Sequence, residues 1–282
     1  MKIINTAEEM QQTALALRAA GKKIGLVPTM GFLHAGHASL LDVCRPECDV
    51  LVVSIFVNPT QFGPNEDLDK YPRDFEHDCE LCGKHGADIV FAPTPETIYA
   101  SDHSTWVVEE VLSKPLCGRT RPIHFRGVAT VVTKLFNLTQ AQVAVFGRKD
   151  AQQALIIERM VRDLNIPVRI IVAPLIRDDD KVALSSRNRY LSGGEREAAR
   201  AISRSLIAAE RSLVSGGAAA APGEAENVRA AIVAAGGKVD YVEALDADTL
   251  AGVTAGSRRV LLAAAAWFGA TRLIDNIMVE YK

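Results

Sequence analysis

The chain has 282 residues, of which 48% are hydrophobic and 23% are charged. This composition is enough to bury a full core, and the length suggests one large domain or two of moderate size. With 32 basic and 34 acidic residues the formal net charge is -2, and no Lys/Arg block stands out. Nucleic acid is therefore not expected as a main partner. The longest apolar runs, 50–57 and 260–268, fall short of the roughly 20 residues that span a bilayer, so no membrane partner is expected.

The N-terminal segment and the cysteines bear on location. Residues 1–10 contain two acidic residues and no apolar stretch, so they do not predict a signal peptide. Five cysteines, an odd number, are scattered along the chain, which is typical of reduced thiols rather than of a disulfide framework. We predict a cytoplasmic protein.

His77, Cys79, Cys82 and His85 have a spacing that would suit zinc. The surrounding pattern predicts a helix over 74–86, on which four such side chains would fan out over about 200° of the surface. We therefore interpret them as small, partly buried thiols and solvated histidines.

The first part of the chain alternates short apolar runs with helix-length patterns. Helices are predicted over 38–48, 127–138 and 151–164. The apolar runs are rich in β-branched and aromatic residues, as in strands buried on both faces of a parallel sheet: 24–27, 50–57, 88–91, 143–146 and 168–172. Such a βαβ succession with right-handed crossovers predicts a doubly wound α/β domain over 1–175.

The remaining residues, 176–282, are predicted to form a smaller α+β domain. A polar stretch at 177–189 leads to a long charged helix at about 194–214. The glycines and alanines that follow, ending at Pro222-Gly223, are interpreted as a linker. A helix near 224–235 and three strands are predicted after it, the strands at 239–245, 259–264 and 272–280.

The segment from Pro28 to His37 follows the first of these strands and begins a helix. Ligands of open α/β sheets bind beyond the carboxyl ends of the strands, where the next helix offers unpaired N–H groups and a partial positive charge. Gly31 and Gly36 allow close backbone approach, while His34 and His37, three residues apart, can share one site. Imidazoles and helix N–H groups suit a polyphosphate, although two surface histidines in a turn would give the same short pattern. Neither GxGxxG nor the P-loop pattern is present, which weakens dehydrogenase and P-loop kinase interpretations.

Four further polar segments stand at predicted element ends. Residues 53–62 carry a strand into the amides of Asn58 and Gln61, which can bind a small hydroxy acid without adding charge. Residues 146–153 place Gly147 and Lys149 after another strand, and 185–188 combine hydroxyls with Arg187, a suitable clamp for a triphosphate. The fourth segment is cationic and contains Arg119, Arg121, His124 and Arg126.

Taken together, these segments resemble the pantothenate synthetases, or pantoate–β-alanine ligases, a family of HxGH nucleotidyltransferases. The resemblance covers nearly the whole chain and rests on the following stretches: PTMGxLHxGHxSL at 28–40, VSIFVNPxQF at 53–62, YPR at 71–73, RPxHFRGVxTVV at 121–132, FGxKDxQQ at 146–153 and SSRNxYLS at 185–192. It implies a Rossmann-like N-terminal domain, a smaller C-terminal lid domain and a homodimer. It also implies the reaction, in which pantoate and ATP give pantoyl adenylate and pyrophosphate, and β-alanine then displaces AMP.

The resemblance also implies roles for individual residues. Met30, His34, Gly36 and His37 would hold ATP, the two histidines on its phosphates and His37 as the proton donor. Gln61 would contact pantoate and β-alanine, and Gln153 would hold pantoate. The other implied ATP ligands are Gly147, Lys149, Asp150, Ile176, Leu184, Ser185, Ser186 and Arg187. Among them Lys149 would act catalytically on phosphate. Mg²⁺ is implied as well, held mainly through the ATP phosphates.

Two positions depart from the family pattern. Lys181 replaces a glycine in the stretch before the serines, so the turn there is expected to avoid a positive φ. Arg148 stands where an acidic residue is common and adds charge beside the phosphates.

Two other interpretations stay open. One is an HxGH adenylyltransferase that acts on a phosphorylated precursor, which would not need the amides from Asn58 to Gln61 or Gln153. The other is a nucleotide-binding module without activity, against which the intact His34, His37, Lys149 and Arg187 speak.

Overall fold

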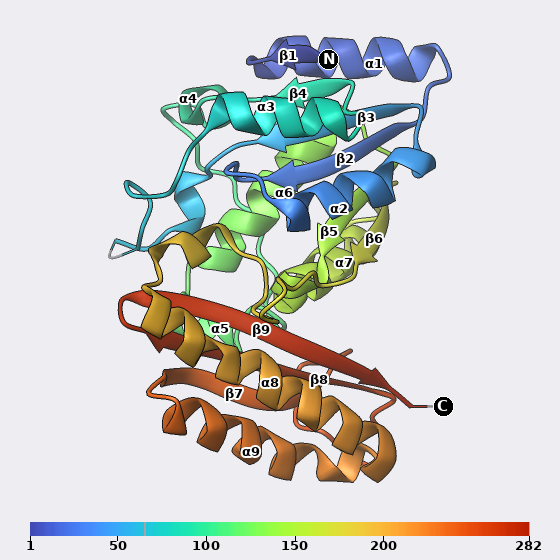
Figure 1. Ribbon diagram of the computed structural model, residues 1–282. Helices are drawn as coiled ribbons and strands as arrows, with labels where there is room; N and C mark the ends of the chain where they lie inside the picture. Colours follow the sequence, from blue (N-terminus) through green and yellow to red (C-terminus); the bar gives the residue numbers. More distant parts are fainter. Residues whose placement is uncertain (65, 282) are drawn as a thin grey trace. The chain divides into compact units, whose positions relative to one another are not determined.

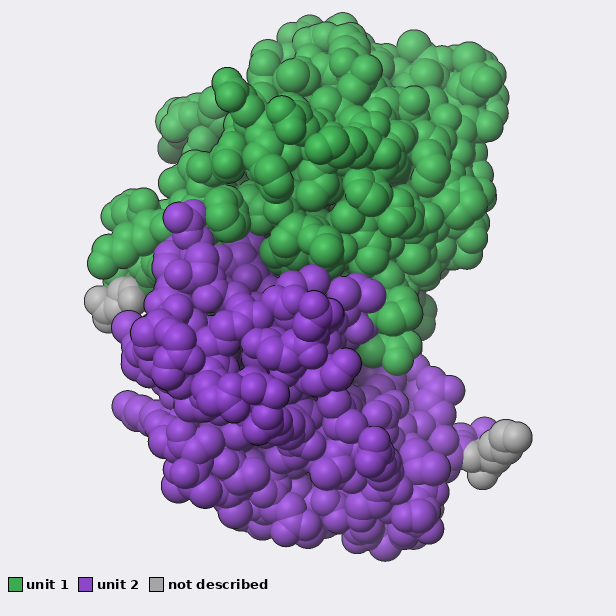
Figure 2. All heavy atoms as spheres, viewed as in Figure 1, with its two compact units in different colours: residues 1–114, 118–148, 156–174 green, residues 115–117, 149–155, 175–282 purple. Residues whose placement is uncertain are grey.

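The computed structural model describes residues 1–64 and 66–281, and these form two compact units (Figure 2). The first unit comprises 1–114, 118–148 and 156–174, and the second comprises 115–117, 149–155 and 175–282. Over this described part, the helices are too short or too polar to cross a membrane. The five cysteines all lie within it, and none of them forms a disulfide.

The first unit contains a six-stranded parallel sheet with the order β1-β4-β3-β2-β5-β6 (Figure 1). The strands are β1 (Lys2–Ile4), β2 (Ile24–Thr29), β3 (Val50–Ile55), β4 (Ile89–Phe91), β5 (Val143–Gly147) and β6 (Arg169–Ala173). From β2 the chain winds outward through β3 and β4 and then returns to β5 on the other side of β2. The order therefore reverses between β2 and β5, which is where open α/β sheets bind ligands.

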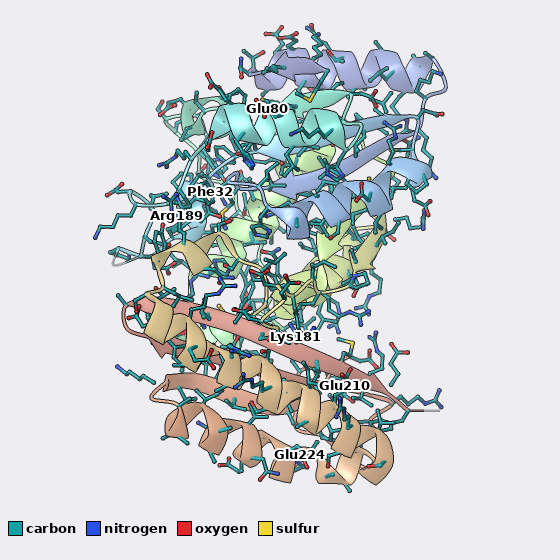
Figure 3. All side chains as sticks on the ribbon, in the orientation of Figure 1. Phe32, Glu80, Lys181, Arg189, Glu210 and Glu224 are labelled. Carbon is teal, nitrogen blue, oxygen red and sulfur yellow. The ribbon has the colours of Figure 1, made fainter. Side chains whose placement is uncertain are left out.

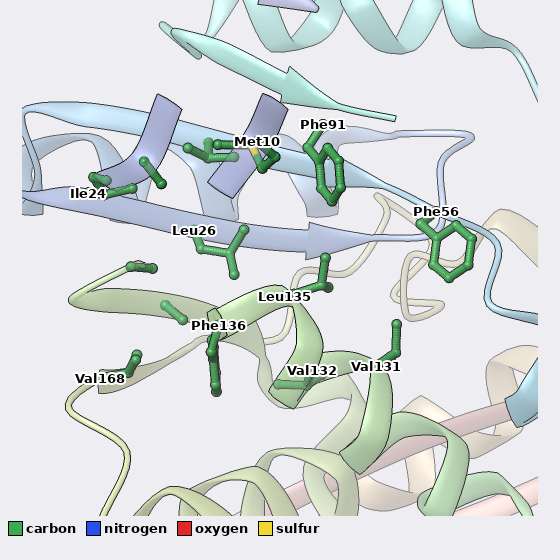
Figure 4. Packing of buried hydrophobic residues seen from close by; sticks show 14 of the residues in the cluster. Met10, Ile24, Leu26, Phe56, Phe91, Val131, Val132, Leu135, Phe136 and Val168 are labelled. Carbon is green, nitrogen blue, oxygen red and sulfur yellow. The ribbon is translucent and has the colours of Figure 1, made fainter. Parts of the chain in front are cut away.

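Helices cover both faces of this sheet because its strands are apolar on both sides. Leu26, Val52 and Ala144 pack with residues of α1 (Ala7–Ala19), α6 (His124–Thr139) and α7 (Ala151–Asp163) in one cluster, part of which is shown in Figure 4. On the other face, strand residues such as Val27 and Val53 pack with α2 (Ala35–Cys44) and α3 (Phe75–Lys84). Shorter helical elements lie in the connections: η1 (Arg45–Glu47), η2 (Pro59–Gln61), α4 (Pro95–Ile98), α5 (Cys117–Thr120) and η3 (Arg148–Asp150).

The second unit contains a three-stranded antiparallel sheet, β7-β8-β9, that packs against two helices. Its central strand is almost entirely buried, because α8 and α9 contribute residues such as Leu206 and Ile232 to the same cluster. The elements of this unit are η4 (Ser186–Tyr190), α8 (Gly193–Gly216), η5 (Ala218–Ala220), α9 (Ala221–Ala234), β7 (Lys238–Asp246), β8 (Arg259–Phe268) and β9 (Thr271–Glu280).

These observations confirm the predicted fold class, a doubly wound α/β sheet with a smaller α+β part. Three local predictions were incomplete or wrong. β1 and α1 were not predicted. The supposed linker at 215–223 is the end of α8, the 3₁₀ turn η5 and the start of α9, where Pro222 occupies the first turn of the helix and so costs no hydrogen bond. Helix α2 begins at Ala35 rather than at residue 38.

Gly25 in β2 packs closely against Cys44, the last residue of α2, and against Cys48. A Cβ placed on it would lie 2.7 Å from the Sγ of Cys44 and 2.7 Å from the Sγ of Cys48. Both thiols pack against the strands of this face of the sheet, so they would have to shift within packed surroundings to make space.

We therefore expect Gly25→Ala to lower the free energy of unfolding by about 1–3 kcal/mol through overpacking. Gly83→Ala is the matched control, because a Cβ at that position in α3 meets nothing within 4 Å. Urea denaturation should show the control unchanged or stabilised by up to about 1 kcal/mol, as expected for alanine in a helix. Equal effects of the two substitutions would contradict the packing argument.

Candidate active site

The turn between β2 and α2 is held by the carboxylate of Asp78, a buried residue of α3. The backbone is left-handed at Gly31 (φ 82°) and Phe32 (φ 51°), and Phe32 is labelled in Figure 3. Asp78 accepts hydrogen bonds from the N–H of Phe32 (2.8 Å to Oδ2) and of Leu33 (2.6 Å to Oδ1). Burial raises the pKa of Asp78, and these two N–H donors offset only part of the rise. One buried acid therefore fixes the backbone that leads to the histidines.

His34 and His37 cap the N-terminus of α2 with their side chains. His34 Nδ1 accepts from the Gly36 N–H at 3.1 Å, and His37 Nδ1 accepts from the His34 N–H at 3.3 Å. The ring centroids are 4.1 Å apart. Because Nδ1 of each neutral ring is the acceptor, these hydrogen bonds assign the ring proton to Nε2. Each histidine is thus an Nε2–H donor beside the positive end of a helix, a combination suited to phosphate oxygens.

Asn58 and Gln61 lie beyond the end of β3, the strand next to β2, and both are buried. Asn58 Nδ2 donates to Gln61 Oε1 at 3.0 Å, and Gln61 Nε2 lies 3.1 Å from the Sδ of Met30. The main chain packs directly on α6, since a Cβ on Gly127 would fall 2.5 Å from the carbonyl oxygen of Thr60. Gln61 therefore lies beside Met30, which belongs to the turn that leads to the histidines.

Arg121 and His124 hold the main chain of Gln61. Its carbonyl oxygen accepts from His124 Nδ1 at 2.9 Å and from Arg121 Nη2 at 3.2 Å. Arg121 also binds Glu66 through both carboxylate oxygens, with Nε 3.0 Å from each. Burial alone would raise the pKa of Glu66, but the hydrogen bonds and charge of Arg121 outweigh it and keep this pKa below its ordinary value. Two members of the cationic segment therefore have a positioning role for Gln61.

The predicted site residues fall in both units, and each group is described within its own unit. Met30, His34, Gly36, His37, Gln61 and Gly147 belong to the first unit, and the second holds Lys149, Asp150, Gln153, Ile176, Leu184, Ser185, Ser186 and Arg187. Gly147 ends β5, which lies beside β2 at the reversal of strand order.

Within the second unit, β9 supports two of the predicted phosphate-binding segments. Asn276 Nδ2 donates to the carbonyl oxygen of Lys149 at 3.0 Å, and Lys149 Nζ lies 3.4 Å from Asp150 Oδ2. The neighbouring Asp275 forms a buried ion pair with Arg177. Burial raises the pKa of Asp275, and Arg177 offsets only part of that rise.

The segment from Ile176 to Arg187 forms a compact loop. The Leu184 N–H donates to the carbonyl of Ile176 at 3.1 Å. Ser185 caps η4 by accepting from the Arg187 N–H at 3.3 Å. The backbone of the serines is therefore ordered by local hydrogen bonds and by the Arg177 ion pair.

The expectation for Lys181, labelled in Figure 3, was wrong. Its φ is 72°, so it adopts the left-handed conformation that a glycine would supply. The turn demands this geometry: the Lys181 N–H donates to the Asp178 carbonyl at 2.8 Å, and the Asp178 N–H donates to the Val182 carbonyl at 2.9 Å. These two backbone hydrogen bonds outweigh the preference of a residue with a Cβ for negative φ.

Sequence reasoning missed Asp78 as a site residue. A signal was present, because Asp78 lies four residues before Cys82, a fully buried residue of the same helix. An acid on the apolar face of a helix needs buried partners. Helix α3 itself was predicted correctly. In the parts of the chain that the structure describes, no group of three or more His, Cys, Asp or Glu side chains could hold a metal ion.

The fold and the site define a class of protein. A Rossmann-like sheet with an HxGH turn at its switch point, where two imidazole donors flank a helix N-terminus, is built to bind a nucleotide polyphosphate.

The comparisons narrow this class to one family. The chain matches the sequence profile described as Pantoate-beta-alanine ligase over residues 2–278. Pantothenate synthetase of Thermotoga neapolitana is 51% identical over 99% of this chain and 100% of its own, and pantothenate synthetase 1 of Bradyrhizobium diazoefficiens is 49% identical over 100% and 99%. The crystal structure of pantothenate synthetase from Thermus thermophilus is similar with a TM-score of 0.90, at 40% identity, over 98% of this chain and 99% of that one. The chain belongs to the pantoate–β-alanine ligase family.

A structure from the same family carries ligands. Pantoate-beta-alanine ligase from Francisella tularensis, described as complexed with beta-gamma ATP and beta-alanine, is similar with a TM-score of 0.81 at 33% identity. The match covers 98% of this chain and 97% of that one.

Lys181 provides a test of backbone strain. A left-handed backbone conformation costs a non-glycine residue about 1–2 kcal/mol. Replacing that residue by glycine relieves this strain, but part of the gain is lost because glycine is more flexible in the unfolded chain. We expect Lys181→Gly to raise the free energy of unfolding by about 0.5–1 kcal/mol, and Lys181→Ala, which keeps the Cβ, to leave it nearly unchanged. Urea denaturation measures both. A glycine variant less stable than the alanine variant would contradict this account.

Glu66 provides a test of the ion pair with Arg121. Because the pKa of Glu66 is lowered in the fold, its stabilisation is present above the pKa of the unfolded chain, about 4.3, and is lost as the pH falls through the folded value. We expect Glu66→Gln to cost about 1 kcal/mol at neutral pH, and the difference from the wild type to shrink as the pH falls below the unfolded value of about 4.3. Urea denaturation across this range checks it, with the exposed Glu80→Gln as control. A difference independent of pH would refute the assignment.

Proposed function

We propose that the protein condenses pantoate with β-alanine at the expense of ATP and releases AMP and pyrophosphate. One structural observation carries the proposal: the Asp78-held turn presents two Nε2–H donors at the start of α2, beside the buried amide of Gln61. Phosphate-binding and hydroxy-acid-binding groups therefore share one edge of the sheet. Membership of the ligase family supports the same substrates.

The first step is adenylation. A carboxylate oxygen of pantoate attacks the α-phosphorus of ATP, an acyl–phosphate bond forms, and the bond to pyrophosphate breaks. His34, His37 and the N–H groups at the start of α2 bind the negative charge that develops on the leaving pyrophosphate. Met30 and Gly36 line the nucleotide site, and Gln61 and Gln153 hold pantoate in line for attack.

In the second step the amine of β-alanine attacks the acyl carbon, loses a proton, and displaces AMP. Gln61 contacts both acceptors in turn. In the second unit, Lys149 neutralises phosphate charge and Asp150 binds the ribose hydroxyls. Gly147 and Ile176 contact the nucleotide, and Leu184, Ser185, Ser186 and Arg187 close over the triphosphate.

The residues of this site fit Mg²⁺ that is bound mainly through the phosphates of ATP. A small hard cation favours phosphate and water oxygens over an all-protein cage, and the donors at this site are chiefly N–H groups and cations that themselves seek phosphate. When bound, Mg²⁺ would reduce the repulsion between the triphosphate and the attacking carboxylate.

We further propose a cytoplasmic homodimer in which residues 1–175 form the nucleotide- and pantoate-binding domain and residues 176–282 act as a lid. Cysteines without disulfides accord with a reducing compartment. Sedimentation of the purified chain would test the dimer.

The overall reaction has a direct test. The purified chain is incubated with ATP, Mg²⁺, pantoate and β-alanine, and AMP and pantothenate are measured. Formation of both in equal amounts is expected. An absence of turnover would refute the function, and AMP without pantothenate would indicate another acceptor.

Two substitutions test the adenylation roles. We expect His37→Ala and Lys149→Ala each to slow pantoate-dependent ATP–pyrophosphate exchange by about 10² to 10³, the effect of losing one preorganised donor. His85→Ala, which removes a surface histidine paired with Asp42, should keep the wild-type rate. Circular dichroism checks that each variant is folded. A near-normal exchange rate in either active-site variant would exclude the assigned role.

A further inference from the structure

The side chain of Asn58 is clamped at both ends. Its Oδ1 accepts hydrogen bonds from the hydroxyls of Tyr99 and Thr60, each at 2.9 Å, and from the Thr60 N–H at 3.4 Å. Its Nδ2 donates to Gln61 Oε1 at 3.0 Å and to the Gly127 carbonyl at 3.2 Å. A rotation of the amide by 180° would direct its oxygen at two acceptors, so the network permits one orientation.

This orientation determines which end of Gln61 can meet a substrate. Gln61 Oε1 is engaged by Asn58, and Nε2 is the end that points to the Sδ of Met30. A thioether is a weak acceptor. The Gln61 Nε2–H group can therefore leave the Met30 sulfur for a carboxylate or hydroxyl oxygen of a substrate, which accepts a stronger hydrogen bond.

Tyr99 begins this chain of hydrogen bonds. Its ring is held independently of the hydroxyl, with centroids 4.9 Å from His103 and 6.5 Å from Phe56, and with Lys134 Nζ 5.7 Å away over the ring. Burial raises the pKa of Tyr99, and its hydrogen bonds offset only part of the rise. At neutral pH the hydroxyl is therefore a proton donor.

We propose that Tyr99 is a positioning residue for substrate selection, whose hydroxyl orients Asn58 so that Gln61 offers an N–H donor to an oxygen of pantoate. The order of donors is Tyr99 to Asn58, Asn58 to Gln61, and Gln61 to substrate. This inference rests on the proposed function and adds a residue that does not itself contact the substrate.

Tyr99→Phe tests the proposal because it removes the hydroxyl and keeps the ring. We expect the KM for pantoate to rise about tenfold, the effect of one misplaced hydrogen bond, while the KM for ATP stays within about twofold. Tyr281→Phe is the control, since it also deletes a tyrosine hydroxyl that forms a hydrogen bond, here to the Leu213 carbonyl at 3.2 Å in the second unit. It should leave all constants unchanged.

Thr60→Val removes the other hydroxyl that donates to Asn58 Oδ1, and the oxygen of that hydroxyl lies 3.2 Å from the Tyr99 hydroxyl. Either hydroxyl alone still disfavours the rotated amide, so we expect the double variant Tyr99→Phe/Thr60→Val to raise the KM for pantoate by more than the product of the single effects. This excess reports orientation, which a loss of stability would not produce. Urea denaturation of each variant accompanies the kinetics.

The outcomes distinguish a failure of the positioning role of Tyr99 from a failure of the proposed function. If the wild type makes pantothenate and Tyr99→Phe leaves its KM for pantoate within about twofold, the positioning role is refuted. If the KM values for all three substrates rise together with a loss of stability, the hydroxyl is merely structural and the inference fails. If the wild type makes no pantothenate, the proposed function fails and this inference fails with it.

Discussion

The two hydrogen bonds that Asp78 accepts from the turn after β2 are the constraint on which the rest of the site depends. Two adjacent residues, Gly31 and Phe32, adopt left-handed backbone, which for Phe32 is unfavourable by about 1–2 kcal/mol. The carboxylate compensates by accepting two N–H groups that would otherwise lose their partners on burial. The raised pKa of Asp78 records the cost of keeping an acid in this place. This contact therefore stabilises the backbone conformation that places His34 at the N-terminus of α2.

The same turn explains why the histidines act as a pair. Each uses Nδ1 to accept a backbone N–H, so capping the helix and fixing the tautomer are one event. The cap and the proposed phosphate donor are therefore the same side chain in His37, because replacing it also removes the partner of the His34 N–H. Asn58 and Gln61 follow the same logic with amides, where one orientation of a buried side chain decides which end of the next one faces substrate.

Features with a clear local sequence pattern could be predicted from the sequence, whereas unusual local geometry and contacts between distant residues could not. Strands such as β3 and β5 are continuous apolar runs, and the glycine and histidine spacing at 31–37 predicts a ligand site because it follows a strand. The start of α2 was misplaced because His34 caps it by its ring, which sequence rules reserve for smaller side chains. Asp78 and Tyr99 were not predicted as site residues because their partners lie more than 40 residues away in the sequence. The conformation of Lys181 was predicted wrongly because backbone hydrogen bonds of the turn impose its positive φ.

The second unit gives a reason why two separate segments can act together. β9 holds the carbonyl of Lys149 through Asn276, and it holds the loop before Ser185 through the pair of Asp275 with Arg177. These anchors are consecutive residues of one strand, and Asp275 is almost completely buried, so neither segment can shift alone without breaking a buried hydrogen bond or leaving a charge unpaired. A displacement of β9 would carry the lysine and the serine loop as one body. The proposed cationic and hydroxyl ligands of the triphosphate are therefore coupled by the strand that supports them. The amides proposed to select the acid are fixed by their own network in the first unit.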